Sequence, residues 1–384
     1  MSLEWTLVDT SYNNNWTSVT YGYDASGNDA SGNGLFVAVA ASGDGNRVMT
    51  SPDGITWTSQ DTTQFNNKWN SVTYGYDASG NDASGNGLFV AVAASGDGNR
   101  VMTSPDGINW TSQTSASNNN WKSVTYGIDV GLFVAVAASG DGYRVMTSPD
   151  GITWTSQTAA VNNFWQNVTY GYNTSGIGLF VAVSSDGVDR VMTSPDGITW
   201  TSRDTPGNYT WRGVTYGYNA SGIGLFVAVA TNNGVMTSYD GITWTLQTPA
   251  QNAIWTNVTY APGLFVAVSS SGDTMTSPDG ITWTIGEYLK TSCLSITYGN
   301  DTFVIVGNNE TVPISSYSPI PPIPPIPPFN PLNITNSIEL LTFMDSSFNY
   351  GNITNSFGIN YNLIASNSKK LTIENTDIDI WEIP

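Results

Sequence analysis

One heptapeptide, Ser-Pro-Asp-Gly-Ile-Thr-Trp, recurs along this chain and constrains its fold more than any other feature. It occurs unchanged at Ser51–Trp57, Ser148–Trp154, Ser194–Trp200 and Ser277–Trp283, and with one substitution at Ser104–Trp110 and Ser238–Trp244. The tryptophan that ends each copy recurs every 39 to 53 residues. Self-similarity at such a period is typical of solenoids, propellers and other repeat architectures.

Four strand-like runs appear within each period. They are Trp-x-x-Val-Thr-Tyr, Gly-Leu-Phe-Val-Ala-Val, Arg-Val-Met-Thr-Ser and Ile-Thr-Trp-Thr. The Pro-Asp-Gly between the last two runs predicts a tight turn, because Pro presets its φ, Asp can accept backbone N–H groups and Gly adopts a positive φ. The second run has no polar alternation, which is typical of a strand covered on both faces. Four such strands per repeat indicate the blade of a β-propeller.

Counting the runs predicts how the ring closes. Each of the first three runs has seven copies if residues 311–316 form a degenerate third strand, but only six fourth strands follow their own third strand. The missing fourth strand is Leu3–Val8, at the other end of the chain. We therefore expect an all-β, seven-bladed β-propeller of four-stranded blades over residues 1–316. The N-terminal strand joins the last blade, so no sheet edge stays open between the first and last blades.

The composition changes after this propeller. Residues 317–331 contain a Pro-Ile-Pro-Pro tract, which predicts a polyproline II linker that serves as a semi-rigid spacer. Residues 332–384 carry β-like runs at Ile338–Phe343, Ile359–Ile364, Leu371–Ile373 and Ile378–Ile383. A tail of this size is marginal as a lone domain, so we expect a β-rich C-terminal segment that docks or anchors.

The heptapeptide resembles the Asp-box of the sialidase-like propellers, whose pattern is Ser-x-Asp-x-Gly-x-Thr-Trp, although Asp and Gly are adjacent here. The resemblance implies a structural role, not a catalytic one, for the aspartates Asp53, Asp106, Asp150, Asp196, Asp240 and Asp279. The near-identical repeats, the Asn-rich composition and the Pro-Ile-Pro-Pro tract also resemble uncharacterised repeat propellers of large DNA viruses. That second resemblance implies a virion or surface-structure component.

The composition restricts the chemistry of the chain. There is no histidine, which removes the commonest general base and the commonest transition-metal ligand. The net charge of −19 makes nucleic acid and anionic membranes poor partners. Neither a signal peptide nor a membrane span is expected from the sequence, and the single cysteine, Cys293, cannot form an intrachain disulfide.

Calcium is the one metal for which the acidic loops offer candidate ligands. Ser-Gly-Asp-Gly-Asn at 42–46 and 95–99, together with Asp24 and Asp29, offers oxygen ligands for calcium but matches no EF-hand spacing. Such loops are usually turns, so the sequence predicts no cofactor, with calcium as the alternative. Four arginines, Arg47, Arg100, Arg144 and Arg190, occupy equivalent places in successive repeats and need not converge on one substrate.

Six tryptophans are the candidate binding residues. They open the first strand-like run of successive repeats, after Asn-rich connectors: Trp16, Trp69, Trp121, Trp165, Trp211 and Trp255. An exposed ring of indoles with amide neighbours would suit sugar stacking or a protein interface. The alternative is that these indoles are packed between blades.

These observations favour a non-enzymatic binding or scaffold propeller. It would contact protein partners through its face and its C-terminal tail. A carbohydrate-binding propeller is the alternative and a glycoside hydrolase, which needs two suitably spaced carboxylates, is the third hypothesis.

Overall fold

The computed structural model describes residues 3–10, 12–23, 34–43, 45–64, 66–76, 87–308, 311–317, 333–335, 350–354, 360–366, 370–374 and 381–382. The chain divides into two compact units, Met1–Ile323 and Pro324–Pro384. All regular elements in the described residues are β-strands. None of these residues belongs to a helix that is long and apolar enough to cross a membrane.

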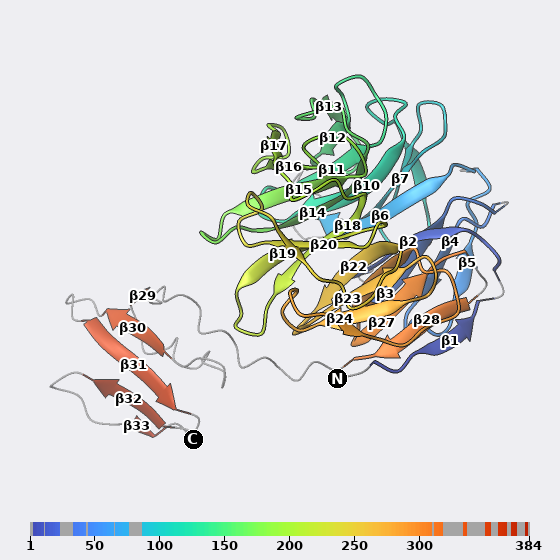
Figure 1. Cartoon of the computed structure of the whole chain (residues 1–384). Helices are drawn as coiled ribbons and strands as arrows, with labels where there is room; N and C mark the ends of the chain where they lie inside the picture. The colour runs from blue at the N-terminus through green and yellow to red at the C-terminus, as the bar shows by residue number, and fades with distance from the viewer. Residues whose placement is uncertain are drawn as a thin grey trace. The chain divides into compact units, whose positions relative to one another are not determined.

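The first unit is a seven-bladed β-propeller of four-stranded antiparallel sheets, as the repeats predict (Figure 1). Blade 1 comprises β2 (Trp16–Tyr23), β3 (Gly34–Ala40), β4 (Val48–Ser51) and β5 (Thr58–Gln60), and blade 2 comprises β6 (Trp69–Tyr76), β7 (Gly87–Ala93), β8 (Val101–Ser104) and β9 (Thr111–Gln113). Blade 3 comprises β10 (Trp121–Gly127), β11 (Leu132–Ala137), β12 (Val145–Ser148) and β13 (Thr155–Gln157), and blade 4 comprises β14 (Trp165–Tyr172), β15 (Gly178–Ser184), β16 (Val191–Ser194) and β17 (Thr201–Arg203). Blade 5 comprises β18 (Trp211–Tyr218), β19 (Gly224–Ala230), β20 (Gly234–Ser238) and β21 (Thr245–Gln247), and blade 6 comprises β22 (Trp255–Ala261), β23 (Leu264–Ser269), β24 (Thr274–Ser277) and β25 (Thr284–Ile285).

The seventh blade joins the two ends of the propeller. Its strands are β26 (Ser295–Gly299), β27 (Thr302–Val306) and β28 (Thr311–Ser316), and β1 (Thr6–Asp9) pairs with β28 as the outermost strand. Figure 1 shows β1, in blue, beside the orange β28. The predicted closure is confirmed, although the strand begins at Thr6 and not at Leu3. Leu3 precedes it and is buried in a cluster with Cys293 and Phe303.

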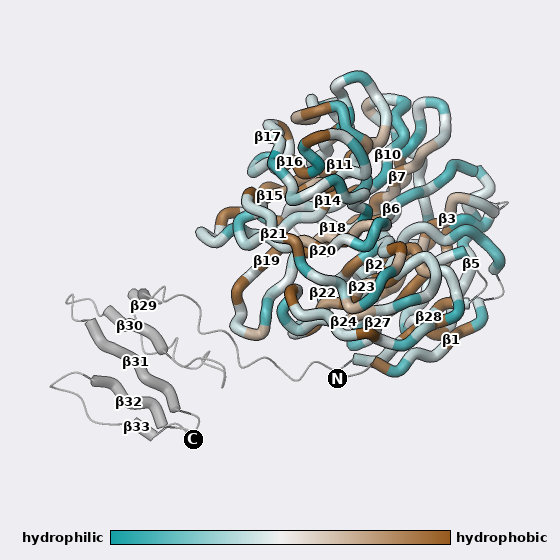
Figure 2. The backbone as a smooth tube through the Cα atoms, in the orientation of Figure 1, coloured by the Kyte–Doolittle hydropathy of each residue, from teal (hydrophilic) through white to brown (hydrophobic). Residues whose placement is uncertain are grey.

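The core lies between neighbouring blades. The second strand of each blade is buried on both faces; Phe36 to Ala40 of β3, for example, have no exposed surface. Val37, Val39 and Val48 of blade 1 pack against Trp69 and Phe89 of blade 2. Figure 2 shows hydrophobic segments recurring around the propeller, separated by hydrophilic stretches. This packing accounts for the absence of polar alternation in the second run.

A glycine in the first strand allows this close approach of blades. A Cβ on Gly75 would lie 2.4 Å from Cγ of Tyr126, which belongs to the next blade. The Tyr126 ring in turn packs at 4.8 Å between centroids against Phe133 of its own blade. The repeated Val-Thr-Tyr-Gly sequence therefore combines an aromatic side chain with the backbone position that receives the equivalent ring of the next blade.

The second unit contains a five-stranded sheet in the order β29-β30-β31-β32-β33. Its strands are β29 (Asn333–Thr335), β30 (Tyr350–Thr354), β31 (Asn360–Ser366), β32 (Lys370–Glu374) and β33 (Trp381–Glu382). β29 pairs parallel with β30, and the other pairs are antiparallel. Three of the four predicted runs overlap β31, β32 and β33. The fourth, Ile338–Phe343, lies outside the described residues, as does the Pro-Ile-Pro-Pro tract.

Candidate functional site

The first strand of blades 1 to 6 carries a bulge that directs one side chain toward the centre of the ring. In blade 1, Trp16 pairs with Ala40 and Ser18 pairs with Val39, so Thr17 is left without a partner. The same register shift follows the first tryptophan in blades 2 to 6. A β-bulge re-aims the extra residue out of the regular alternation. The residues directly after the tryptophans are thus set apart from the interblade core.

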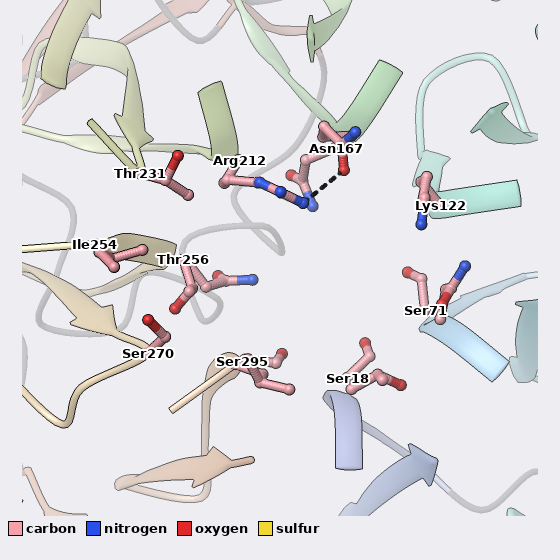
Figure 3. A pocket seen from close by; sticks show the side chains of 15 residues that line it. Ser18, Ser71, Lys122, Asn167, Arg212, Thr231, Ile254, Thr256, Ser270 and Ser295 are labelled. Atoms are coloured by element: carbon pink, nitrogen blue, oxygen red, sulfur yellow. Dashed lines mark hydrogen bonds between the residues drawn. The ribbon is translucent and has the colours of Figure 1, made fainter. Parts of the chain in front are cut away.

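These residues line a central pocket of about 370 Å³, the mouth of the propeller channel. All seven blades contribute the residue at this position: Thr17, Asn70, Lys122, Gln166, Arg212, Thr256 and, in the seventh blade, Leu294. Thr231, Ile254 and Ser270 also line the pocket. Figure 3 shows the labelled side chains arranged around this opening, with Arg212 extending into it. We refer to this pocket as the channel mouth.

A second set of polar side chains connects neighbouring blades around the channel mouth. The backbone N–H groups of Val72, Val124 and Val19 donate to the hydroxyl oxygens of Ser18 (3.1 Å), Ser71 (3.2 Å) and Ser295 (3.3 Å). The inner edge of each first strand would otherwise present unpaired N–H groups, which are costly when buried. The three hydroxyl hydrogens have no acceptor among the described residues, so these serines can still donate to a ligand in the pocket.

Three of the side chains at the bulges make hydrogen bonds to the neighbouring blade. The hydroxyl groups of Thr17 and Thr256 donate to the backbone carbonyls of Trp69 and Cys293, each at 2.7 Å. The Asn70 amide likewise donates to the carbonyl of Trp121 at 2.6 Å. Each bond joins one blade to the next and satisfies the polar atom that makes it.

The other three bulged polar side chains form one wall of the channel mouth, across blades 3, 4 and 5. Nη1 of Arg212 donates to Oε1 of Gln166 at 3.0 Å, and the Gln166 amide donates to Oγ of Ser185, also at 3.0 Å. Within the described part of the chain, the Lys122 ammonium group makes no ion pair or hydrogen bond. Burial, and then the charge of Arg212, lowers the pKa of Lys122, and burial lowers the pKa of Arg212. The wall is therefore cationic, and the lining residues that the structure describes include no carboxylate.

The six tryptophans predicted as a binding ring do not form an exposed surface. Trp16, Trp69, Trp121, Trp165, Trp211 and Trp255 are all 0% exposed. Each packs in an interblade cluster, as Trp121 does with Val90 and Val92 of the preceding blade. The exposed-ring interpretation is therefore wrong and the interblade alternative is observed. A large apolar side chain at the start of an inner strand buries most surface by entering the space between two sheets.

The heptapeptide aspartates hold the turn between the third and fourth strands. Oδ1 of Asp53 accepts the N–H groups of Ile55 (2.8 Å) and Thr56 (2.7 Å) and the hydroxyl of Ser51 (3.0 Å). Nε1 of Trp57 donates to the carbonyl of Gly54 at 2.8 Å, and Gly54 has a φ of 76°. Burial alone would raise the pKa of Asp53, but these hydrogen bonds outweigh it and hold the pKa below its ordinary value. The same shift occurs at Asp106, Asp150, Asp196, Asp240 and Asp279.

The four equivalent arginines also make hydrogen bonds within the propeller. Nη1 of Arg47 donates to the carbonyl of Asn67 at 2.6 Å, and that of Arg144 donates to Asn163 at 2.7 Å, each in the connector that enters the next blade. Arg100 and Arg190 make the equivalent bonds to the carbonyls of Asn119 and Tyr209. These guanidinium groups tie adjacent blades together and do not converge on a common point.

The calcium alternative stays a prediction. No group of three or more cysteine and acidic side chains in the described residues is placed to hold a metal ion. Asp24, Asp29 and Asp44, which belong to the candidate loops, lie outside the described residues.

Sequence reasoning missed the channel mouth, although a signal was present. The position after the first tryptophan is Thr, Asn, Lys, Gln, Arg and Thr in blades 1 to 6, while the flanking tryptophan and Val-Thr-Tyr are invariant. The next position also varies, as Ser, Ser, Ser, Asn, Gly and Asn. Two variable positions inside an otherwise constant strand indicate side chains that the repeat packing does not restrict.

The fold and this pocket define a seven-bladed β-propeller with a polar central pocket. Neither a protein-family model nor a curated protein matches the chain. Among solved structures, virginiamycin B lyase from Staphylococcus aureus is similar at 11% identity and a TM-score of 0.64, over 82% of this chain and 100% of that one. A streptogramin B lyase is similar at 10% identity and a TM-score of 0.63, over 82% and 98%. YCF48 bound to D1 peptide is similar at 16% identity and a TM-score of 0.55, over 82% and 97%. At these identities the likeness shows the fold alone.

Proposed function

We propose that this chain is a non-enzymatic propeller, a structural or surface component that binds a protein partner at the channel mouth. The observation that carries the proposal is the pocket itself. Apart from Ile254 and Leu294, the described residues that line it carry hydroxyl, amide or cationic side chains, and none of them is a carboxylate. Such a lining can hold a ligand by hydrogen bonds and charge, and its described residues include neither a histidine nor a carboxylate to act as a general base.

Two further observations support binding over catalysis. One of the similar lyase structures is of a catalytically inactive variant in which a histidine is replaced by alanine, and this chain contains no histidine. The heptapeptide aspartates, the most regularly placed carboxylates, are engaged by turn hydrogen bonds as at Asp53. The similar YCF48 structure holds a peptide, so a propeller of this architecture can serve peptide recognition.

The size of the pocket indicates what part of a partner it holds. Its volume of about 370 Å³ is at the lower end of the range for ligand pockets, roughly 300–1,000 Å³. It can therefore take a side chain or a short projecting segment, with the rest of the partner on the surrounding connectors. The tail, with its separate sheet, supplies the second predicted contact region.

The carbohydrate alternative has lost the feature that suggested it. Sugar stacking needs exposed aromatic faces, and the six indoles expected to provide them are fully buried. No observation in the described part of the chain singles out a pair of facing carboxylates for glycoside hydrolysis. Protein binding is the function that the channel mouth favours.

A random peptide library displayed on phage, selected against the immobilised full chain, tests the proposal. We expect enrichment of a sequence class whose binding is lost in Ser270→Trp, which places an indole in the lining of the channel mouth. The matched control is Ile242→Trp, a 46% exposed position in the heptapeptide turn of blade 5, which should retain binding. Failure to enrich peptides, or equal binding by Ser270→Trp, would contradict the proposal. A glycan array signal lost only in Ser270→Trp would favour the carbohydrate alternative.

A further inference from the structure

The cationic wall of the channel mouth is unusual for a chain of this charge. The net charge is −19 and only 11 residues are lysine or arginine. Two of them, Lys122 and Arg212, nevertheless face the same pocket from blades 3 and 5. At physiological salt the Debye length is about 8 Å, so carboxylates farther away contribute little to the potential there. The lining, not the net charge, decides which ligand the pocket favours.

Hydrogen-bond donors dominate this lining. Arg212 is oriented by its bond to Oε1 of Gln166, which uses one of its five N–H groups. Lys122 offers three donors that no described residue accepts. Ser18, Ser71 and Ser295 each accept a backbone N–H, which uses one lone pair of each oxygen, and their hydroxyl hydrogens remain to donate. The complement of several convergent donors and two positive charges is an oxyanion.

The pocket holds the two cations at a cost. Burial lowers the pKa of both groups, and the charge of Arg212 lowers that of Lys122 further. Two like charges that share a partly desolvated pocket repel one another. A bound anion would relieve this repulsion and would supply the acceptor that Lys122 does not find within the described fold.

We propose that the channel mouth is an oxyanion site that takes one acidic side chain of the partner, held between Lys122 and Arg212 and hydrogen-bonded by the serine hydroxyls. This inference rests on the proposed function, because it specifies the partner as an acidic peptide segment. Gln166 is a positioning residue, since it acts through its bond to Arg212. The pocket has room for a single such side chain and not for a folded domain.

Matched peptides provide the test on the full chain. The probes are an end-blocked peptide of four glutamates, the same peptide with four glutamines, and inorganic phosphate, each measured by calorimetry. We expect the glutamate peptide to bind at least about tenfold tighter than the glutamine peptide, the effect of one charge-assisted hydrogen bond. Lys122→Gln and Arg212→Gln should each remove that difference, and Arg212→Lys should keep part of it.

Two control variants change the net charge equally without touching the pocket. Arg203→Gln alters a guanidinium that donates to Oγ1 of Thr193 on a neighbouring strand, and Lys290→Gln alters an exposed lysine. Both should bind the glutamate peptide like the wild type. Equal binding of the two peptides, or a loss in Arg203→Gln as large as in Arg212→Gln, would overturn the inference.

The outcomes separate this inference from the proposed function. If neutral library peptides bind and are lost only in Ser270→Trp, the channel mouth binds peptides and the oxyanion inference is wrong. If inorganic phosphate binds through Lys122 and Arg212 while no peptide binds, the pocket is a small-anion site and the assignment of an acidic peptide is wrong.

Discussion

Replacing Leu3 by alanine tests whether the N-terminal segment closes the ring. Leu3 is 8% exposed and packs with Leu289, Cys293 and Phe303. Leucine-to-alanine changes in a core cost about 2–5 kcal/mol, less where the surroundings can collapse. Leu3 precedes β1 near the start of the chain, where its neighbours can adjust. We therefore expect a loss of about 2–3 kcal/mol in the free energy of closing the seventh blade.

Cys293 reports on this closure because it is the chain's single cysteine and has no exposed surface. Burial, and then the nearby charge of Asp273, raises the pKa of its thiol to about 12. The thiolate is the reactive form, so labelling by a thiol reagent requires the blade to open. If opening is a fast pre-equilibrium, 2–3 kcal/mol corresponds to an increase of about 30- to 150-fold in labelling rate.

The assay compares labelling rates of Leu3→Ala and Leu7→Ala with the wild type under native conditions, together with urea unfolding. Leu7 lies within β1 and is 50% exposed, so its truncation should change the free energy of unfolding by no more than about 0.5 kcal/mol. Equal labelling rates in all three proteins would refute closure through Leu3. Equal acceleration of labelling by both variants would show that any truncation in the N-terminal segment opens the blade, and that the effect is not specific to the buried Leu3 side chain.

Three other predictions concern the repeats. Asp196→Ala removes the acceptor for the N–H groups of Ile198 and Thr199 and should lower the free energy of unfolding by about 1–3 kcal/mol in urea; a change below about 0.5 kcal/mol would show that the turn closes without the carboxylate. Trp121→Ala should cost about 3–5 kcal/mol in the same assay, because the indole is fully buried, whereas an exposed indole would cost almost nothing. The heptapeptide aspartates have lowered pKa values, so their stabilising contribution is present above about pH 4 and is lost as the pH falls through their folded-state pKa values. Thermal melting across acidic pH should show this loss, and Asp196→Asn should weaken the pH dependence; an unchanged profile would contradict the assignment.

The sequence by itself determined the blades, their number and the closure of the ring. Each repeat contains its own turn chemistry, as in Pro52-Asp53-Gly54, and its own doubly buried strand, as in β3. These are local features, and local propensity and pattern agree in every copy. The missing fourth strand of the last blade was detectable because the other six copies set the expected order. The tail lacks such repetition, and β29 and β30 were not anticipated there.

Only the tertiary structure decided which side chains face the channel mouth. Thr17 and Leu294 are far apart in the sequence and line the same pocket because the ring closes between them. The bulge after each tryptophan sends the indole between the blades and the next residue into the channel, a distinction of one position that period-two alternation does not reveal. Lys122 and Arg212 share a pocket through the packing of three successive blades, so no motif in the chain could place them together.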